Sequence, residues 1–450
     1  MRYTDLNVSF RKPDIWKKPT KDTFYKEKAY ADIIAEMQDL DKLKKDIKEE
    51  INKNVDMCTN LSQSKGELSN NMSDMFDHFG RSVIMTDDFE EKYLLGKTNK
   101  NTLAKKLQPW CGNLVFNIQR VIESPPLANL FGKFKGKPAF VVLAGPSLKN
   151  NIEELKKVGD KGIVIATDTA FRPCLEAGIK VHLVMAHDAN PQGMRFFLPK
   201  DHPYQNANIH FNDMPFPQLM QEVLPQLKMD EKRREYKYDT IGVFVNYCHP
   251  LTIEAFNGSE LCFYQVLDPS LPVYALMGGT TNWRREDDKF LPEIKGSIVG
   301  GSSVGHTSTY LAVNLGCDPI TIIGCDLSYP GGLTYVPGAS NQKDASKQKL
   351  IMVRDLSGRE VGTNLSMFSY RMVFQKSLPA IIEQTGIKFF NSTEHEDGSP
   401  AGILEVGAEP KRLKDVINEY CKEDYEDIKN MKELLKTKKK VIEDVGKLKK

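Results

Sequence analysis

A series of short apolar segments, each followed by small or polar residues, most constrains what this chain can fold into. The apolar residues in these segments are consecutive, and helical stretches separate one segment from the next. Such segments are typical of parallel strands that are buried on both faces of a sheet. We therefore expect an α/β fold, a doubly wound Rossmann-like parallel sheet, between residues 110 and 410. The segments are Pro138–Leu143, Gly162–Ala166, Ile179–Ala186 and Pro319–Ile323.

The two ends of the chain differ from the middle. Residues 1–109 are expected to be a helical and irregular N-terminal region, because apolar residues recur every three or four positions between Lys26 and Asn54. Residues 411–450 are expected to be basic amphipathic helices. These terminal helices would pack on the core or pair with a second subunit, which makes a homo-oligomer one expectation. A basic face for a membrane or nucleic acid is the weaker interpretation, because acidic residues are interleaved throughout.

Composition excludes several classes of protein. The 450 residues contain 62 Lys+Arg and 60 Asp+Glu, a net charge of +2, which does not favour nucleic-acid binding. With 40% hydrophobic residues the chain is globular, and no apolar run has the length of a membrane span. The N-terminus lacks the apolar stretch of an export signal, and the eight cysteines show no Cys-x-x-Cys pair. We expect a cytoplasmic protein with reduced thiols and no integral membrane segment.

Gly145, Pro146 and Ser147 follow the first predicted strand and precede a helix. Glycine permits close approach of a ligand, proline suits a helix start, and the serine hydroxyl can cap the helix or donate to an anion. The pattern is neither Gly-x-Gly-x-x-Gly nor a Walker loop. A phosphate-binding turn and a plain capped turn explain these residues about equally well.

Asp168 and Asp188 follow the second and third predicted strands. The carboxyl ends of parallel strands share one edge of the sheet, where ligands of such folds bind. A carboxylate there can accept hydrogen bonds from a sugar or a base, or hold a metal. The alternatives are a helix cap for Asp168 and a turn for Asp188, and two equivalent positions favour the ligand interpretation.

The segment 300–308 combines glycines, hydroxyls and one histidine before an apolar helix. Ser303 and Gly305 lie where exposed amides could bind a second anion, and His306 could act as a general acid or base near neutral pH. A packing or capping histidine is an equally good interpretation of His306. No other histidine shows metal-ligand spacing, and packing is the better interpretation for most of them; they include His187, His249 and His395.

Asp326 follows the strand that begins at Pro319, and a glycine-containing loop with Tyr329 and Tyr335 comes next. The two tyrosine hydroxyls could both donate to a leaving phosphate, whereas the alternative is a pair of surface aromatics. His306 and Asp326 are the candidate catalytic residues.

Together these motifs resemble the motility accessory factor proteins, the MptE-like domain family. The resemblance covers roughly residues 110–415 and is specific as a combination. It is carried by Gly145-Pro146-Ser147-Leu148, Ala166-Thr167-Asp168-Thr169-Ala170, His187-Asp188, Gly301-Ser302-Ser303-Val304-Gly305-His306-Thr307, Leu315-Gly316-Cys317-Asp318-Pro319, Ile323-Gly324-Cys325-Asp326-Leu327-Ser328-Tyr329 and Phe390-Asn391-Ser392-Thr393-Glu394.

The resemblance implies an inverting glycosyltransferase that moves a nonulosonic acid from a CMP donor to Ser or Thr of a protein such as flagellin. The motifs are also similar to those of small bacterial sialyltransferases, and the fold would be sialyltransferase-like. No tightly bound cofactor and no metal are implied. Two tyrosines on the later loop, Tyr329 and Tyr335, would bind the donor phosphate. The residues that would line the nucleotide site are Gly145, Pro146, Ser147, Asp168, Asp188, Ser303 and Gly305.

Two other functions remain open. The family name also carries pyrophosphate transfer from ATP to 6-hydroxymethyl-7,8-dihydropterin, which needs magnesium held by clustered carboxylates. The third strand offers a single carboxylate, Asp188, so this diphosphokinase is the second interpretation. The third is a non-catalytic nucleotide-binding or interaction protein, which would not need so many hydroxyls and glycines at the strand ends.

Overall fold

The structure, a computed structural model, describes residues 96–206, 208–267, 283–286, 289–292, 295–340, 343–345 and 350–437. The chain separates into two compact units, residues 1–84 and 85–450, and every described residue belongs to the second. The predicted N-terminal helix from Lys26 to Asn54 lies outside the described residues, as does residue 438 onward.

Within the described residues, nine strands form one sheet in the order β13-β12-β9-β1-β2-β3-β4-β5-β8, and every neighbouring pair is parallel. The predicted α/β doubly wound sheet is confirmed. The strands are β1 (Ala139–Val142), β2 (Ile163–Thr167), β3 (Leu183–Ala186), β4 (Ile241–Val245), β5 (Glu260–Leu267), β8 (Ser297–Val299), β9 (Ile320–Ile323), β12 (Phe389–Asn391) and β13 (Glu409–Pro410). The described part of the chain also forms two antiparallel hairpins outside the sheet: β6 (Trp283–Glu286) with β7 (Lys289–Pro292), and β10 (Ile351–Arg354) with β11 (Glu360–Thr363).

Helices connect the strands. The α-helices are α4 (Gly96–Glu123), α5 (Leu148–Leu155), α6 (Asp168–Glu176), α7 (Phe216–Gln218), α8 (Leu224–Met229), α9 (Glu231–Glu235), α10 (Pro250–Ala255), α12 (Val304–Leu315), α13 (Leu365–Thr385), α14 (Leu413–Tyr420), α15 (Glu426–Lys429) and α16 (Met431–Lys436). Short stretches of tighter or wider helix are η2 (Leu127–Leu130), η3 (Gly159–Lys161), η4 (Pro191–Phe197), η5 (Pro203–Gln205), η6 (Phe211–Asp213), η7 (Leu219–Val223) and η8 (Pro330–Gly332).

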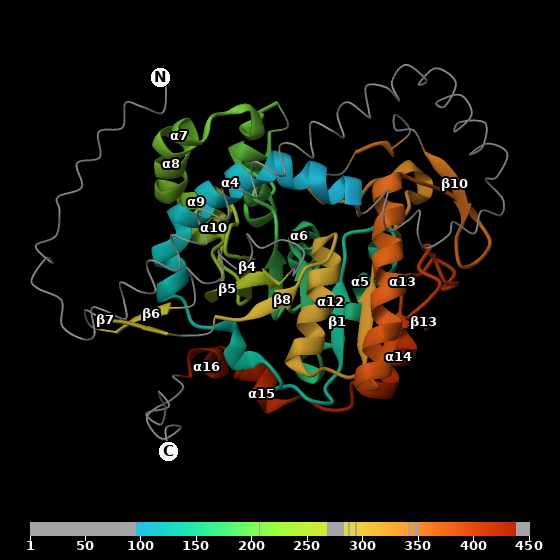
Figure 1. The fold of residues 1–450 in the computed structure, drawn as a ribbon. Coiled ribbons are helices and arrows are strands. Elements are labelled where there is room, and N and C mark those ends of the chain that lie inside the picture. Colours follow the sequence, from blue (N-terminus) through green and yellow to red (C-terminus); the bar gives the residue numbers. More distant parts are fainter. Residues whose placement is uncertain are drawn as a thin grey trace, which may run out of the picture. The chain divides into compact units, whose positions relative to one another are not determined.

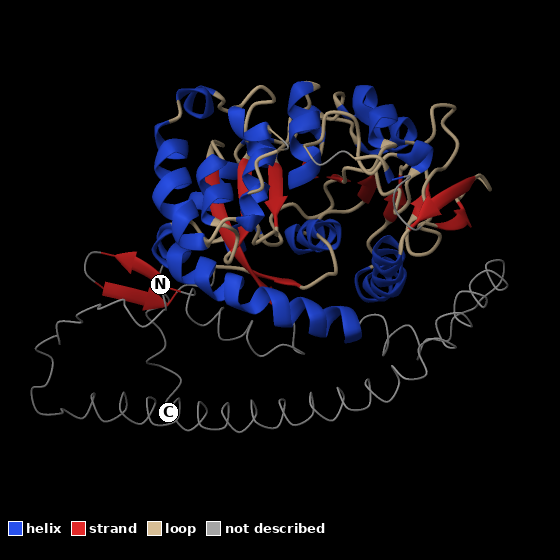
Figure 2. Cartoon of the chain, turned by 90° about the horizontal axis from the view of Figure 1, so that it is seen from above, coloured by secondary structure: helices blue, strands red, loops and turns tan. Residues whose placement is uncertain are grey.

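The sheet is covered on both faces. Helix α12 packs against β1, β2, β8 and β9, whereas α6 packs against β2 and β3. In Figure 1, α12 and α13 lie in front of the strands and α5 and α6 lie behind them. Figure 2, seen from above, shows helices on both sides of the strands. Every residue of β1, β2, β3, β4 and β9 is buried, which explains why the sequences of these strands are almost entirely apolar.

The ends of the described region are tied to this core. Helix α4 runs without a break across residues 109 and 110, and its buried Asn113 and Asn117 donate to backbone carbonyls in the loops after β3 and β4. The predicted helices after residue 411 are three short ones, and buried Leu413, Ile428 and Leu435 anchor them. Within the described residues we find no helix that is both long and apolar enough to span a membrane.

Candidate functional site

The order of the sheet reverses between β1 and β9. From β1 the chain adds β2, β3, β4, β5 and β8 on one side, and β9, β12 and β13 then build the other side. In open parallel sheets ligands bind beyond the carboxyl ends of the strands at such a reversal. The turn with Ser147 follows β1 and Asp326 follows β9, so both predicted residues lie at this point of the edge.

The predicted phosphate turn binds an anion that the protein itself supplies. The backbone N–H and the hydroxyl of Ser147 both donate to Oδ2 of Asp326, at 3.1 and 2.7 Å. Ser147 makes no side-chain cap, and the helix begins only at Leu148, so Pro146 lies in the turn before it. The turn is therefore neither a free phosphate-binding turn nor a plain helix cap. Its hydrogen bonds to Asp326 link the end of β1 to the end of β9.

Gly145 is required by this arrangement. A Cβ atom at this position would lie 2.0 Å from Oδ2 of Asp326 and 2.4 Å from the carbonyl oxygen of Gly324. The glycine therefore allows the approach of an internal carboxylate. Burial raises the pKa of Asp326 to about 6, and the two hydrogen bonds from Ser147 oppose that rise. Oδ1 of Asp326 is buried and has no hydrogen-bond partner among the described residues.

Asp168 and Asp188 lie close enough to affect each other. Asp168 begins α6 and is 6% exposed, and its Oδ1 accepts hydrogen bonds from the N–H and hydroxyl of Thr169. Burial raises the pKa of Asp168 to about 7; the Thr169 bonds oppose this and the charge of Asp188 adds to it. Asp188 is exposed and accepts two hydrogen bonds from Asn190 in a local turn. The structure thus brings both carboxylates together. Asp188 forms the turn that its alternative predicted, whereas Asp168 is the first residue of α6 and does not cap the helix.

Tyr335 lies close enough to the same two carboxylates to be affected by their charges. Its pKa is raised to about 12, chiefly by burial and then by the charge of Asp168, with smaller effects of Tyr329 and Asp188. The N–H of Val336 donates to the carbonyl of Ala144, so the tyrosine loop lies against the end of β1. Tyr329 is buried, and its hydroxyl accepts a hydrogen bond from Asn364 at 2.6 Å. Neither tyrosine is a surface aromatic, the alternative that the sequence left open.

The structure does not support the predicted catalytic role of His306. Its ring is fully buried and stacks on Phe374 at 3.9 Å. Nε2 donates to the carbonyl of Tyr370 at 2.9 Å, so Nδ1 accepts from the hydroxyl of Ser303 at 2.7 Å. Burial lowers the pKa of His306 to about 4. Both nitrogens are engaged and no water can reach them, so His306 is a packing histidine.

The predicted anion site at the start of α12 also has its polar groups bonded within the protein. The hydroxyl of Ser303 is used by His306 and makes no helix cap. Gly305 packs against the end of β1, because a Cβ there would lie 2.7 Å from Cδ2 of Leu143. The start of α12 is therefore held against the edge of the sheet near Ser147, but its own polar groups bond internally.

Two residues that the sequence did not single out hold the tyrosine loop. Asn364 donates to Tyr329, and Arg172, on α6, donates to the carbonyl of Gly338 at 2.8 Å. No sequence signal could have found them, because their partners lie 35 and 166 residues away. Within the described part of the chain, no three His, Cys, Asp or Glu side chains converge as a group of metal ligands.

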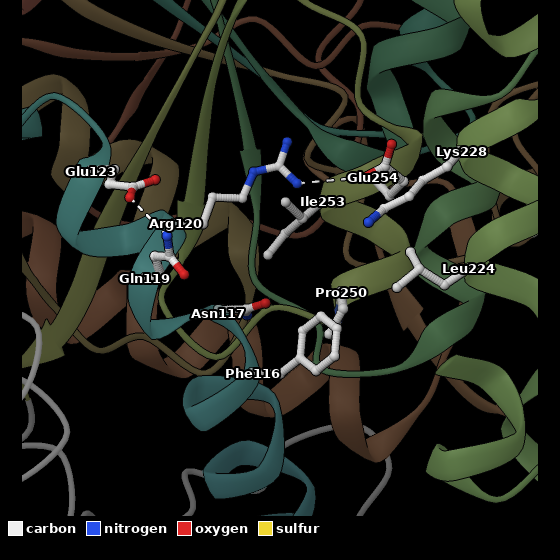
Figure 3. A pocket seen from close by; sticks show the side chains of 10 residues that line it. All are labelled: Phe116, Asn117, Gln119, Arg120, Glu123, Leu224, Lys228, Pro250, Ile253 and Glu254. Carbon is white, nitrogen blue, oxygen red and sulfur yellow. Dashed lines mark hydrogen bonds and ion pairs between the residues drawn. The ribbon is translucent and has the colours of Figure 1, made fainter. Parts of the chain in front are cut away.

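A cavity of about 370 Å³ lies apart from these residues, among α4, α8 and α10 (Figure 3). Arg120 reaches across it toward Glu254 at 3.6 Å, and Gln119 donates to Glu123. None of the predicted site residues lines it. The carboxyl edge of the sheet is the better candidate site, because the titratable groups with raised pKa values and the reversal of strand order coincide there.

Comparison with known proteins gives one family match and one match to a solved structure. Residues 112–332 match the sequence model of the family described as 6-hydroxymethylpterin diphosphokinase MptE-like. Among solved structures, the chain is similar to the MAf glycosyltransferase from Magnetospirillum magneticum AMB-1, with 18% identity and a TM-score of 0.39. That match covers 64% of this chain and 38% of the glycosyltransferase chain. No curated protein sequence matches the chain.

Proposed function

We propose that this chain, which carries an MptE-like domain over residues 112–332, is a glycosyltransferase that uses a CMP-activated nonulosonic acid. The observation that supports the proposal is the group formed by Asp168, Asp188 and Tyr335 at the carboxyl edge of the sheet. The acceptor that we propose is a Ser or Thr hydroxyl of a protein such as flagellin, in the cytoplasm.

The group suits a nucleotide that carries an acidic sugar. Asp188 is an exposed hydrogen-bond acceptor for ribose or base N–H and O–H groups. Asp168 exchanges its proton near pH 7, so it can donate as well as accept. Tyr335 keeps its proton far above neutral pH and is therefore a donor to a phosphate oxygen. Hydroxyl donors placed where charge develops stabilise a leaving group without a metal.

The proposed reaction is a single displacement. The oxygen of the acceptor hydroxyl forms a bond to the anomeric carbon, on the face opposite the phosphate. The bond between that carbon and the phosphate oxygen breaks, and CMP leaves with the electron pair. A base takes the hydroxyl proton, and the configuration at the anomeric carbon is inverted.

A second candidate is the diphosphokinase named in the family description. Asp168 and Asp188 are neighbouring carboxylates of the kind that bind Mg²⁺, and ATP with Mg²⁺ would place its phosphates there. The transferase would bind a cytidine nucleotide and the diphosphokinase would bind ATP with Mg²⁺, so nucleotide binding distinguishes the two functions.

Thermal unfolding with CMP, CTP and ATP, each with and without Mg²⁺, tests the proposal. A ligand that binds only the folded protein at 100 times its dissociation constant should raise the Tm by roughly 5 °C. We expect CMP and CTP to do so without Mg²⁺. Stabilisation by ATP only with Mg²⁺ would favour the diphosphokinase. No response to any nucleotide would contradict both and favour an interaction protein.

A further inference from the structure

The proposed displacement needs a group that takes the acceptor proton, and His306 cannot supply it. A different histidine lies at the same edge of the sheet. His395 follows β12, the strand next to β9, and lies close enough to Asp326 that a proton on its ring would lower the pKa of that carboxyl. Because neighbouring strands lie about 4.8 Å apart, the ends of β12 and β2 are separated by three spacings, about 14 Å. His395 and Asp168 therefore flank the reversal point from opposite sides.

His395 is held by a buried carboxylate. Its Nε2 lies 2.6 Å from Oδ2 of Asp355, whose side chain is fully buried in the turn between β10 and β11. Oδ1 of Asp355 accepts from the N–H and hydroxyl of Ser357 and from the N–H of Arg359. Burial by itself would raise the pKa of Asp355, but these bonds and the one to His395 lower it. Asp355 is therefore an ionised acceptor, and Nε2 of His395 must carry a proton.

With the proton on Nε2, the nitrogen of the neutral ring that is left as a lone-pair acceptor is Nδ1. No hydrogen bond to Nδ1 exists within the described residues, and 16% of the side chain is exposed. The backbone at His395 is also held in place, because the N–H of His395 donates to the carbonyl of Ser399 in a short turn. An imidazole with one nitrogen held by a carboxylate and the other without a hydrogen bond is the arrangement of a general base.

His182 provides the contrast. It also pairs with a carboxylate, Asp160, at 3.2 Å, but it precedes β3 at the opposite edge of the sheet. Its Nδ1 accepts a hydrogen bond from the N–H of Val164, so neither nitrogen is open. The two pairs share their chemistry and differ in whether a nitrogen remains for a substrate.

We propose that His395 is the general base of this transferase and that Asp355 is its positioning residue. Nδ1 of His395 takes the proton of the acceptor hydroxyl while the oxygen bonds to the anomeric carbon and CMP departs with its electron pair. The imidazolium then releases the proton to solvent. The inference rests on the proposed function, and it assigns a role to a histidine that the sequence pattern assigned to packing.

Release of CMP from CMP-N-acetylneuraminic acid, with and without recombinant flagellin, tests this assignment in the full chain. General-base catalysis contributes 10²–10⁴-fold, so His395→Gln should lower kcat at least 100-fold with KM within about threefold of wild type. Asp355→Asn should lower kcat about tenfold, again with KM unchanged. His182→Gln and Asp160→Asn are the matched controls, and their kcat should stay within threefold of wild type. Imidazole added to His395→Gly should restore part of the turnover.

The outcomes separate the two proposals. An inactive wild type would overturn the proposed function and this assignment with it. An active wild type with an equally active His395→Gln variant would overturn the assignment alone. If His395→Gln also abolished the Tm shift with CMP, His395 would be a binding or structural group. The assignment would then be wrong.

Discussion

The hydroxyl of Ser147 donates to Oδ2 of Asp326 at 2.7 Å, and this contact joins the two strands between which the sheet reverses its order. The backbone N–H of Ser147 binds the same oxygen. In many nucleotide-binding folds the turn after the first strand leaves its N–H groups for a ligand phosphate. Here an internal carboxylate takes that place, so a ligand phosphate must find its donors elsewhere, and Tyr335 is the donor that we propose.

Replacing Ser147 tests how much this contact stabilises the protein. A hydrogen bond to a charged group is worth about 1.5–3 kcal/mol, so Ser147→Ala should lower the free energy of unfolding by about that amount at pH 8. At pH 5, below the pKa of about 6 of Asp326, the carboxyl is mostly protonated and the loss should be smaller. Urea denaturation at the two pH values measures the difference. Ser328→Ala is the control, because the Ser328 hydroxyl donates to a neutral carbonyl, and its effect should not change with pH.

Gly145→Ala should be far more damaging than an ordinary glycine replacement. The new Cβ would lie 2.0 Å from Oδ2 of Asp326 and 2.4 Å from a backbone oxygen, so the strand ends would have to separate. We expect a loss of more than about 3 kcal/mol in thermal or urea unfolding. Gly112→Ala, in α4 with nothing within 4 Å of its Cβ, should instead stabilise the protein by up to about 1 kcal/mol. Equal effects at the two positions would contradict the packing described here.

Asp168→Asn should change how stability depends on pH. The pKa of Asp168 is raised from 3.8 to about 7, so the unfolded carboxyl loses its proton before the folded one does. Its stabilising contribution is complete below pH 3.8 and is lost as pH rises through 7. Relative to wild type, the variant should therefore gain up to about 4 kcal/mol between pH 4 and pH 8. Unfolding midpoints across this range provide the measurement.

Asp160→Asn serves as the control of opposite sign. The hydrogen bond from His182 holds the pKa of Asp160 well below its usual range. The contribution of Asp160 is thus present at neutral pH and is lost as pH falls below about 4. A parallel pH profile for the two variants would contradict the buried environment of Asp168.

The Tyr329→Phe/Tyr335→Phe double variant should lose turnover and keep its fold. Both hydroxyls are donors that we assign to the leaving phosphate, and removal of such donors costs about 10²–10³ in kcat. Tyr204→Phe is the control, because the Tyr204 hydroxyl bonds Gln226 on an exposed segment. Turnover with a CMP-sugar and the Tm of each variant are the measurements. Unchanged turnover in the double variant would contradict the proposal that the two tyrosines bind the leaving phosphate.

The sequence anticipated the sheet because each strand is a short apolar run, and such runs pack in parallel when helices separate them. It also placed Asp168, Asp188 and Asp326 correctly at one edge, since every parallel strand ends there. Strand lengths were less well anticipated: the third strand begins at Leu183 rather than Ile179, and the buried Ile179 and Val181 lie in the loop before it.

Only the tertiary structure decided which polar groups meet. Ser147 and Asp326 are 179 residues apart, and His395 and Asp355 are 40 apart on different elements. His306 carries the same local signal as a catalytic histidine, yet Phe374 and Tyr370 bury it from a helix later in the chain. Local periodicity determines the strands and their ends. The partners of a side chain depend on long-range packing, which no short pattern of residues contains.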